Sequence, residues 1–264
     1  MNETTTLIDS GYGCVKKSRY GYMLYNKFEM YIGRSFDLYG EFSYGESKLF
    51  EQIVKSGDVV LDIGANIGAF TLLFSKLVTP QGSVFAFEPQ RVVFQMLCAN
   101  AAMNSCTNVH TINKCVGKDY LGVDVLELDQ YKVTNFGGLS IGSDGKTPTI
   151  KVGVVVIDDL MLGRCDFIKI DVEGMERDVL LGATETIKRC KPIMYIENDR
   201  AKKSAELIST ISELGYVIYE HNPYLYNADN YFGCKVNIFG NIVSKNLLCV
   251  HRSFDLKVDG LKEL

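Results

Sequence analysis

The stretch VVLDIGANIGAF, residues 59–70, begins as a buried strand and turns at two glycines into a helix. Its strand portion is apolar apart from Asp62, which is typical of a strand inside a covered sheet. Gly64 and Gly68 permit positive φ and close approach to a ligand, and the Asn66 amide can bond the ligand or brace the loop. Since unpaired N–H groups at a helix start attract anionic groups, the pattern predicts a ligand site at this turn.

Apolar runs alternate with helical patterns on both sides of this stretch, and this alternation favours a mostly parallel sheet covered by helices on both faces. We predict seven strands in the main sheet, at residues 59–63, 83–87, 108–112, 166–171, 192–197, 215–219 and 247–251. Helices are predicted from Glu46 to Gly57 and at 68–77, 90–103, 175–189 and 202–214, with an extra strand near 149–156.

The first 45 residues are rich in Tyr, Phe and Gly with rough alternation, which favours short antiparallel strands over helix. We therefore predict a β-rich N-terminal arm or lid over residues 1–45, followed by one α/β domain over 46–264. The aromatic segment 220–246 lies between the last two strands, and long loops inside a compact domain are commonly functional.

Composition narrows the classes of partner. The 264 residues carry a net charge of −4 and contain no dense Lys/Arg tract, so nucleic acid is disfavoured as a partner. No apolar run is long enough to span a membrane, and the N-terminus lacks a secretory pattern. We expect a cytoplasmic protein whose eight scattered cysteines are reduced. Nothing in the sequence indicates an oligomeric state.

The next predicted strand ends in FAFEP, which puts Glu88 where a carboxylate can accept both hydroxyls of a ribose. Nicotinamide cofactors and S-adenosylmethionine both fit a strand, a glycine loop and this carboxylate. A dinucleotide fingerprint has three glycines as GxGxxG, whereas this loop has the spacing GxNxG with Asp62 two positions before it. The loop therefore favours S-adenosylmethionine.

A second stretch, CDFIKIDVEGMERDVLLGA at residues 165–183, is more specific. Phe167, Lys169 and Asp171 share one face of its strand, and Asp171 comes at the carboxyl end, where sheets of this kind keep their reacting groups. Charged residues in a central strand are costly unless paired or functional. A purely structural pair between Lys169 and Asp171 is the alternative, and it is compatible with a role at the site.

Together with DVVLDIGANIGAFTLLFSKLV, FAFEPQ, NFGGLS and NLLCVHR, this stretch resembles the FkbM-type family of S-adenosylmethionine-dependent methyltransferases over roughly residues 40–251. The resemblance implies a Rossmann-like class I methyltransferase fold, with seven strands of which the last is antiparallel. It also implies methylation of hydroxyl groups, often on sugars or natural products.

The family's site residues carry over where its motifs match. The resemblance implies that the methionine part of the cofactor is bordered by Asp62, Gly64, Asn66 and Gly68, and that Glu88 binds its ribose. Tyr44 and Glu46, from the motif YGE, are expected to close over the same pocket. The family motif NxGG matches Asn135, Gly137 and Gly138, which we expect near the pocket. The segment NKCVG after the third strand offers no acidic residue to hold adenine, so recognition of the adenine stays open.

Methyl transfer requires alignment of the acceptor oxygen with the methyl carbon and a group that accepts its proton. Asp171 is the first candidate for that base, or for orienting the acceptor, with Lys169 beside it. His221, at the start of the aromatic segment, is the second candidate.

Asp171, Glu197 and Asn198 could also hold Mg²⁺ or Mn²⁺, as in catechol-type O-methyltransferases. The alternative is that Glu197 and Asn198 only cap the next helix.

The prediction is an S-adenosylmethionine-dependent O-methyltransferase acting on a sugar, a glycan or a small polar metabolite. An NAD-dependent oxidoreductase and a cofactor-binding protein without turnover are alternatives. A nucleic-acid methyltransferase is a further alternative, against which the acidic charge argues.

Overall fold

A computed structural model describes residues 6–136, 147–254 and 258–264 of the chain. Its largest sheet has eight strands in the order β15-β13-β14-β12-β11-β4-β5-β6. In chain order these strands are β4 (Val59–Ile63), β5 (Ser83–Phe87), β6 (Val109–Ile112), β11 (Phe167–Ile170), β12 (Ile193–Glu197), β13 (Tyr216–His221), β14 (Asn246–His251) and β15 (Lys262–Glu263).

Strand directions follow the predicted pattern. The strands from β6 to β12 are parallel, and β14 lies antiparallel between β12 and β13. All seven predicted strands are present, but the predicted number is one too small because β15 pairs antiparallel with β13. The two residues of β15 are polar and exposed, so no apolar run marks it in the sequence.

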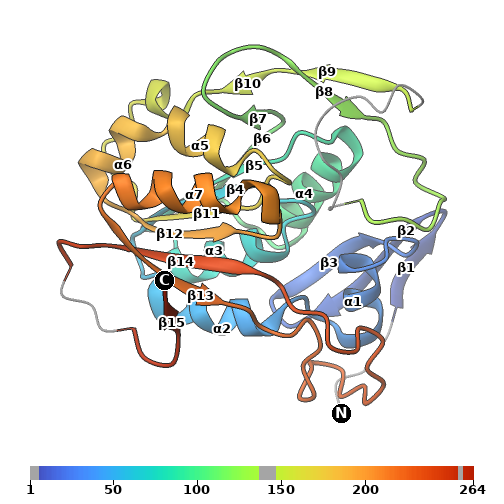
Figure 1. The fold of residues 1–264 in the computed structure, drawn as a ribbon. Helices are drawn as coiled ribbons and strands as arrows, with labels where there is room; N and C mark the ends of the chain where they lie inside the picture. Colours follow the sequence, from blue (N-terminus) through green and yellow to red (C-terminus); the bar gives the residue numbers. More distant parts are fainter. Residues whose placement is uncertain (1–5, 137–146, 255–257) are drawn as a thin grey trace.

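Helices cover both faces of this sheet (Figure 1). One face carries α2 (Tyr44–Ile53) and α3 (Ala69–Val78), which pack around Phe50 and Phe74. The other face carries α5 (Glu176–Gly182), α6 (Thr184–Cys190) and α7 (Ala201–Glu213), which pack around Ile168. The central strands are therefore buried on both sides, as their continuous apolar runs predict.

The N-terminal residues form a three-stranded antiparallel sheet, β1 (Thr6–Ser10), β2 (Gly13–Ser18) and β3 (Gly21–Asn26), which contacts α4 (Arg91–Met103). The prediction of strands over helix is wrong beyond this point, because α1 spans Ile32–Tyr39. Ile32, Phe36 and Tyr39 are spaced along one helix face, on which Phe36 and Tyr39 are buried and Ile32 is half-buried.

The predicted helix at 175–189 is also wrong in one respect, since it is divided at Ala183 into α5 and α6. At the break, a Cβ on Gly182 would lie 2.0 Å from the carbonyl oxygen of Gly117, so only glycine allows this contact. The remaining elements are short: β7 (Cys115–Val116), β8 (Val123–Leu126), β9 (Thr149–Val152), β10 (Val154–Val155) and a 3₁₀ helix at Ile157–Leu160. The extra strand predicted near 149–156 is thus two short strands.

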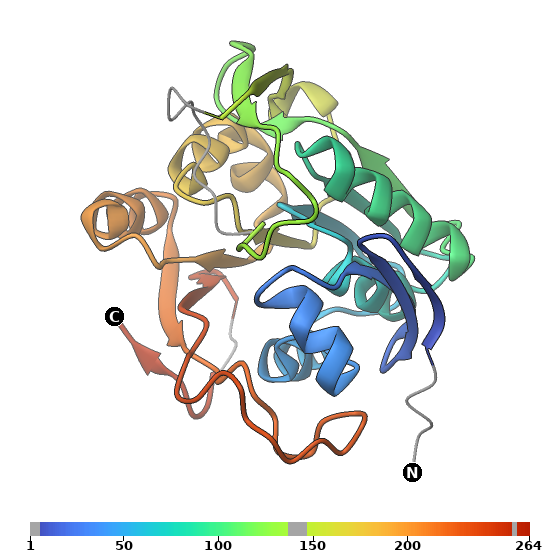
Figure 2. The same cartoon turned by 90° about the vertical axis from the view of Figure 1, so that its right-hand side faces the viewer.

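The segment between β13 and β14 runs alongside α1 (Figure 2). Tyr39 of α1 packs with Leu225 and Phe239 of this segment, and its hydroxyl donates to the carbonyl of Val236 at 2.9 Å. The N-terminal residues and this late segment therefore form one wall beside the sheet. No helix in the described part of the chain is both long and apolar enough to cross a membrane.

Candidate active site

The main cavity lies at the carboxyl ends of β4, β5, β11 and β12 and has a volume of about 510 Å³. Its walls come from distant parts of the chain: α1 and α2, the loop after β4, and the residues that lead into β14. A smaller pocket of about 60 Å³ adjoins it and shares Gly64, Asn66 and Glu88 with it. The loop after β4 therefore lies where the main cavity and the smaller pocket meet.

That loop has the backbone conformation that its sequence predicts. Gly64, Asn66 and Gly68 have φ of 78°, 51° and 89°. A Cβ on Gly64 would lie 1.7 Å from the carbonyl oxygen of Asp171, so a side chain here is excluded by the end of β11. The side-chain oxygen of Asn66 accepts the N–H of Ile67 at 2.8 Å and braces the loop. Asn66 and Gly64 line the cavity, whereas Gly68, which caps α3, does not.

Glu88 is held at the end of β5 by the same loop. Its two carboxylate oxygens accept the N–H groups of Asn66 at 3.0 Å and Gln90 at 2.8 Å. Burial raises the pKa of Glu88 to about 7, against the opposing effect of these two hydrogen bonds. Each oxygen of a carboxylate can accept a second hydrogen bond, so the fixed side chain still offers acceptors to a diol.

Lys169 links β11 to β4 at the floor of the cavity. Its ammonium lies 3.1 Å from Asp171 Oδ2 and 3.8 Å from Asp62 Oδ1, and it donates to the carbonyl of Gly64 at 3.3 Å. Burial opposes the charged form of Lys169, but Asp171, Asp62 and Glu46 offset it, so its pKa is raised. Asp62 is fully buried behind the cavity, where Thr71 donates to it at 2.6 Å. The Lys169–Asp171 pair therefore exists, and both residues also line the cavity.

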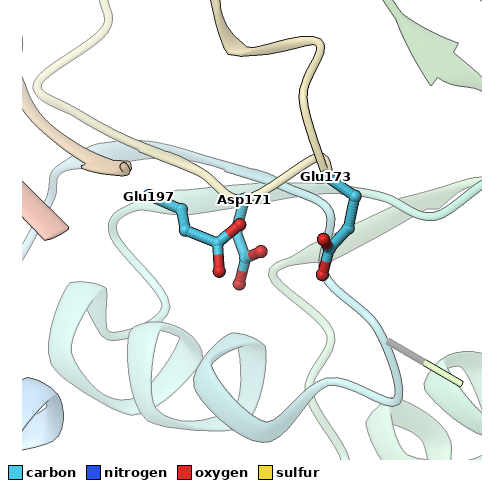
Figure 3. A group of neighbouring side chains, drawn as sticks. All are labelled: Asp171, Glu173 and Glu197. Carbon is cyan, nitrogen blue, oxygen red and sulfur yellow. The ribbon is translucent and has the colours of Figure 1, made fainter. Parts of the chain in front are cut away.

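Three carboxylates, Asp171, Glu173 and Glu197, point toward one another at the end of β11 and β12 (Figure 3). One oxygen from each lies within 4.8 Å of the others. Burial, then the charges of Asp171 and Glu173, raises the pKa of Glu197 to about 11. Within the described residues, its Oε2 is buried and has no hydrogen-bond partner.

The predicted metal set named Asn198 instead of Glu173. The backbone N–H of Asn198 pairs with Lys245, and its side chain does not line the cavity. Glu173, by contrast, is part of the acidic group and pairs with Arg200. Mg²⁺ or Mn²⁺ binding stays a prediction.

The remaining predicted residues divide into those that line the cavity and those that do not. Glu46 and Asn135 line it, while Tyr44 lies outside it with the guanidinium of Arg19 4.1 Å from its ring centre. His221 ends β13 rather than beginning the aromatic loop, and it does not line the cavity. Its Nδ1 is 2.7 Å from the hydroxyl of Tyr195. Gly137 and Gly138 lie outside the described residues.

The smaller pocket has walls that sequence reasoning did not identify. Beside Glu88 it is lined by apolar side chains from β5, β7, β8 and α4, and by Phe136: Phe87, Val93, Cys115, Val116 and Val125. These walls are mostly apolar, in contrast to the charged walls of the main cavity. The only signal in the sequence was the apolar pair Cys115–Val116 after the third strand, in the segment where no acidic residue was found.

Comparison with known proteins places this arrangement in a family. The sequence profile of the methyltransferase FkbM domain matches residues 62–218, more than half of the chain. The 31-O-demethyl-FK506 methyltransferase FkbM of Streptomyces tacrolimicus is 28% identical over 203 residues, which cover 64% of this chain and 77% of that protein. Methyltransferase 1 of Beauveria bassiana (strain ARSEF 2860) is 26% identical over 147 residues, 47% of this chain and 57% of its own length.

Among solved structures, a methyltransferase FkbM from Methylobacillus flagellatus KT aligns with a TM-score of 0.48 and 16% identity. The alignment covers 77% of this chain and 50% of that one, so the chain spans half the length of that protein. The profile match includes the glycine loop, Glu88 and the strand that leads to Asp171. The chain therefore belongs to the FkbM family of methyltransferases.

Proposed function

We propose that the protein transfers the methyl group of S-adenosylmethionine to a hydroxyl group of a sugar, a glycan or a small polar metabolite. The observation that carries this proposal is the meeting of two hollows at Gly64, Asn66 and Glu88. The small apolar pocket suits adenine, the fixed carboxylate of Glu88 suits the ribose hydroxyls, and the large polar cavity leaves room for the methionine part and an acceptor.

The predicted cofactor residues then divide by role. Gly64, Asn66 and Glu88 would touch the cofactor, since they line both the main cavity and the smaller pocket, and Asn135 would touch it from the wall of the main cavity. Asp62 and Gly68 would shape the loop from behind rather than contact the ligand.

Asp171 would orient the acceptor at the strand end, with Lys169 fixing its carboxylate. In-line transfer depends on such positioning, because the acceptor oxygen must face the methyl carbon opposite the sulfur.

The acceptor would enter from the side opposite the adenine pocket. There the cavity is walled by Tyr31 and Ile32 at the start of α1, and by Leu225 and Ile242 of the segment before β14. We propose that residues 1–45 and this segment act together as a lid, with the methyltransferase domain beginning at residue 46. The name of the Streptomyces tacrolimicus relative, which refers to a 31-O-demethyl compound, supports an oxygen acceptor.

The test begins with the purified protein. Mass spectrometry of the denatured sample should detect copurified S-adenosylhomocysteine or S-adenosylmethionine. Incubation with methyl-labelled S-adenosylmethionine and a panel of glycans, polyols and small metabolites should then yield a product whose methyl group is an ether. A product methylated at nitrogen or carbon would contradict the O-methyl proposal and leave the cofactor assignment standing. Binding of NADH in place of S-adenosylhomocysteine would overturn both.

A further inference from the structure

Glu46 is a buried carboxyl group on the wall of the main cavity, near the start of α2. It is 3% exposed, and its Oε1 accepts a hydrogen bond from Ser43 at 2.6 Å. A carboxylate buried this deeply is costly unless it is paired or used. In the described structure, Glu46 has no ion pair with a cation within 4 Å, unlike Asp171, which Lys169 engages at 3.1 Å.

Behind Glu46 lies a second buried polar group. Tyr195 of β12 is 1% exposed. Burial raises the pKa of its hydroxyl most, and the neighbouring Glu46 raises it further. The same hydroxyl lies 2.7 Å from Nδ1 of His221, whose ring stands edge-on to Tyr195 with the two ring centres 5.7 Å apart. The three residues thus form a line from the cavity wall into β12 and β13.

We propose that Glu46 is the general base that takes the proton of the acceptor hydroxyl, and that Tyr195 and His221 are positioning residues that hold it. This inference rests on the proposed O-methyl transfer. In the step, the acceptor oxygen attacks the methyl carbon, and the bond from that carbon to sulfur breaks. The sulfonium becomes the neutral thioether of S-adenosylhomocysteine, and the hydroxyl proton moves to a Glu46 oxygen.

The surroundings of Glu46 suit this role. The groups that act on it are Ser43, Lys169, Asp171 and Ser244, besides Tyr195. Burial raises its pKa to about 7, while Ser43 and Lys169 act in the opposite direction. A base whose pKa lies near the working pH combines a usable carboxylate fraction with a strong tendency to accept a proton.

His221 completes the line without reaching the cavity. Burial lowers the pKa of His221, so the ring is neutral at and above neutral pH. In the neutral tautomer that carries its proton on Nδ1, the ring donates to the Tyr195 oxygen and leaves the Tyr195 proton free for Glu46. A histidine that the sequence marked as a candidate base is therefore assigned here to positioning.

The experiment compares the pH dependence of kcat for the wild type and Glu46→Gln, with the acceptor found in the panel above. Wild-type kcat should rise through about pH 7, because Glu46 must lose its proton before it can act as a base. Glu46→Gln should lower kcat by about 10²- to 10⁴-fold and abolish this rise. Its affinity for S-adenosylhomocysteine by calorimetry should stay within about threefold, because the substitution is isosteric and removes no cofactor contact in this account.

Glu51→Gln is the matched control, since Glu51 lies on the same helix and does not line the cavity. It should leave kcat and its pH dependence unchanged. Tyr195→Phe should lower kcat about tenfold and move the rise to higher pH, because the carboxylate loses a donor. His221→Ala should lower kcat in the wild type but have no further effect in Tyr195→Phe, as expected of residues that act as one unit.

The outcomes separate the two proposals. Methyl transfer to a hydroxyl by the wild type, with unchanged kcat in Glu46→Gln, overturns the role of Glu46 and leaves the proposed function standing. Loss of S-adenosylhomocysteine binding in Glu46→Gln makes it a cofactor residue and also overturns the inference. Wild-type protein that binds S-adenosylhomocysteine but methylates no hydroxyl overturns the proposed function, and the inference with it.

Discussion

The Cβ that Gly64 lacks would lie 1.7 Å from the carbonyl oxygen of Asp171, with φ at 78°. Two constraints therefore meet at this residue, one of conformation and one of space. Gly57 offers a matched control, because its φ of 85° is similar and no atom lies within 4 Å of its missing Cβ.

Gly64→Ala should therefore destabilise the protein far more than Gly57→Ala. In Gly57→Ala the free energy of unfolding should fall only by the cost of a left-handed alanine, about 1–2 kcal/mol. This variant should keep its affinity for S-adenosylhomocysteine. Gly64→Ala should lose more than this and bind the cofactor product poorly, because the loop must separate from β11. Urea unfolding and calorimetry measure both. Equal losses in the two variants would contradict the account of the loop.

The titration of Glu197 should make the free energy of unfolding depend on pH. Burial and the neighbouring charges of Asp171 and Glu173 raise the pKa of Glu197 in the folded chain, so above the ordinary pKa of a glutamate the folded state holds a proton that the unfolded state releases. This contribution is fully present at low pH and is lost as pH rises. Glu197→Gln removes the titration, so its Tm should exceed that of the wild type by an amount that grows from pH 5 to pH 9. The limiting slope is about 1.4 kcal/mol per pH unit.

Glu206→Gln, an exposed position on α7, is the control and should show a constant difference across this range. If the curves of Tm against pH for Glu197→Gln and the wild type are parallel, Glu197 is ionised in the folded protein. A divalent cation could neutralise Asp171, Glu173 and Glu197 in place of a proton, and addition of Mn²⁺ tests this alternative. If a proton does so, EDTA should leave Tm and activity unchanged, whereas Mn²⁺ raising the Tm of the wild type alone would favour a metal.

At the scale of elements, one tyrosine of α1 binds the segment before β14 through two hydrogen bonds. Tyr39 is 1% exposed, and its hydroxyl donates to Val236 at 2.9 Å and accepts the N–H of Ile238 at 3.0 Å. Tyr39→Phe removes both hydrogen bonds, which should cost about 0.5–1.5 kcal/mol each. Because the segment carries Leu225 into the cavity wall, the KM for the acceptor should rise while S-adenosylhomocysteine affinity stays constant.

Tyr224→Phe is the comparison for this prediction, since Tyr224 is 60% exposed on the same segment. It should leave unfolding and KM unchanged. An unchanged acceptor KM in Tyr39→Phe would show that the segment does not form the acceptor wall.

The parallel strands could be predicted because each is a continuous apolar run that ends where polar residues begin. The glycine loop and Glu88 could be placed for the same reason, since both follow such strand ends. Other features depend on contacts between distant residues and left no local signal. The two-residue strand β15, the break at Ala183 and the position of His221 in β13 all belong to this group. Alternation in the N-terminal segment also concealed α1, whose helical face is short.

At the scale of the whole molecule, the net charge of −4 bears on the choice of acceptor. A protein that neutralises several phosphates binds nucleic acid with a steep dependence on salt. We expect RNA binding, measured by fluorescence anisotropy, to be weak and to change little between about 50 and 200 mM salt. Tight binding that falls steeply over this range would favour a nucleic-acid acceptor over a sugar or metabolite.

We propose that the loop after β4 and Glu88 bind S-adenosylmethionine. Isothermal titration of the wild type with S-adenosylhomocysteine and with NADH tests it most directly, with Glu88→Ala as the variant that lacks the proposed ribose carboxylate. We expect saturable binding of S-adenosylhomocysteine to the wild type, binding at least about tenfold weaker to Glu88→Ala, and no binding of NADH. Tight binding of NADH, or S-adenosylhomocysteine affinity that is unchanged in Glu88→Ala, would contradict it.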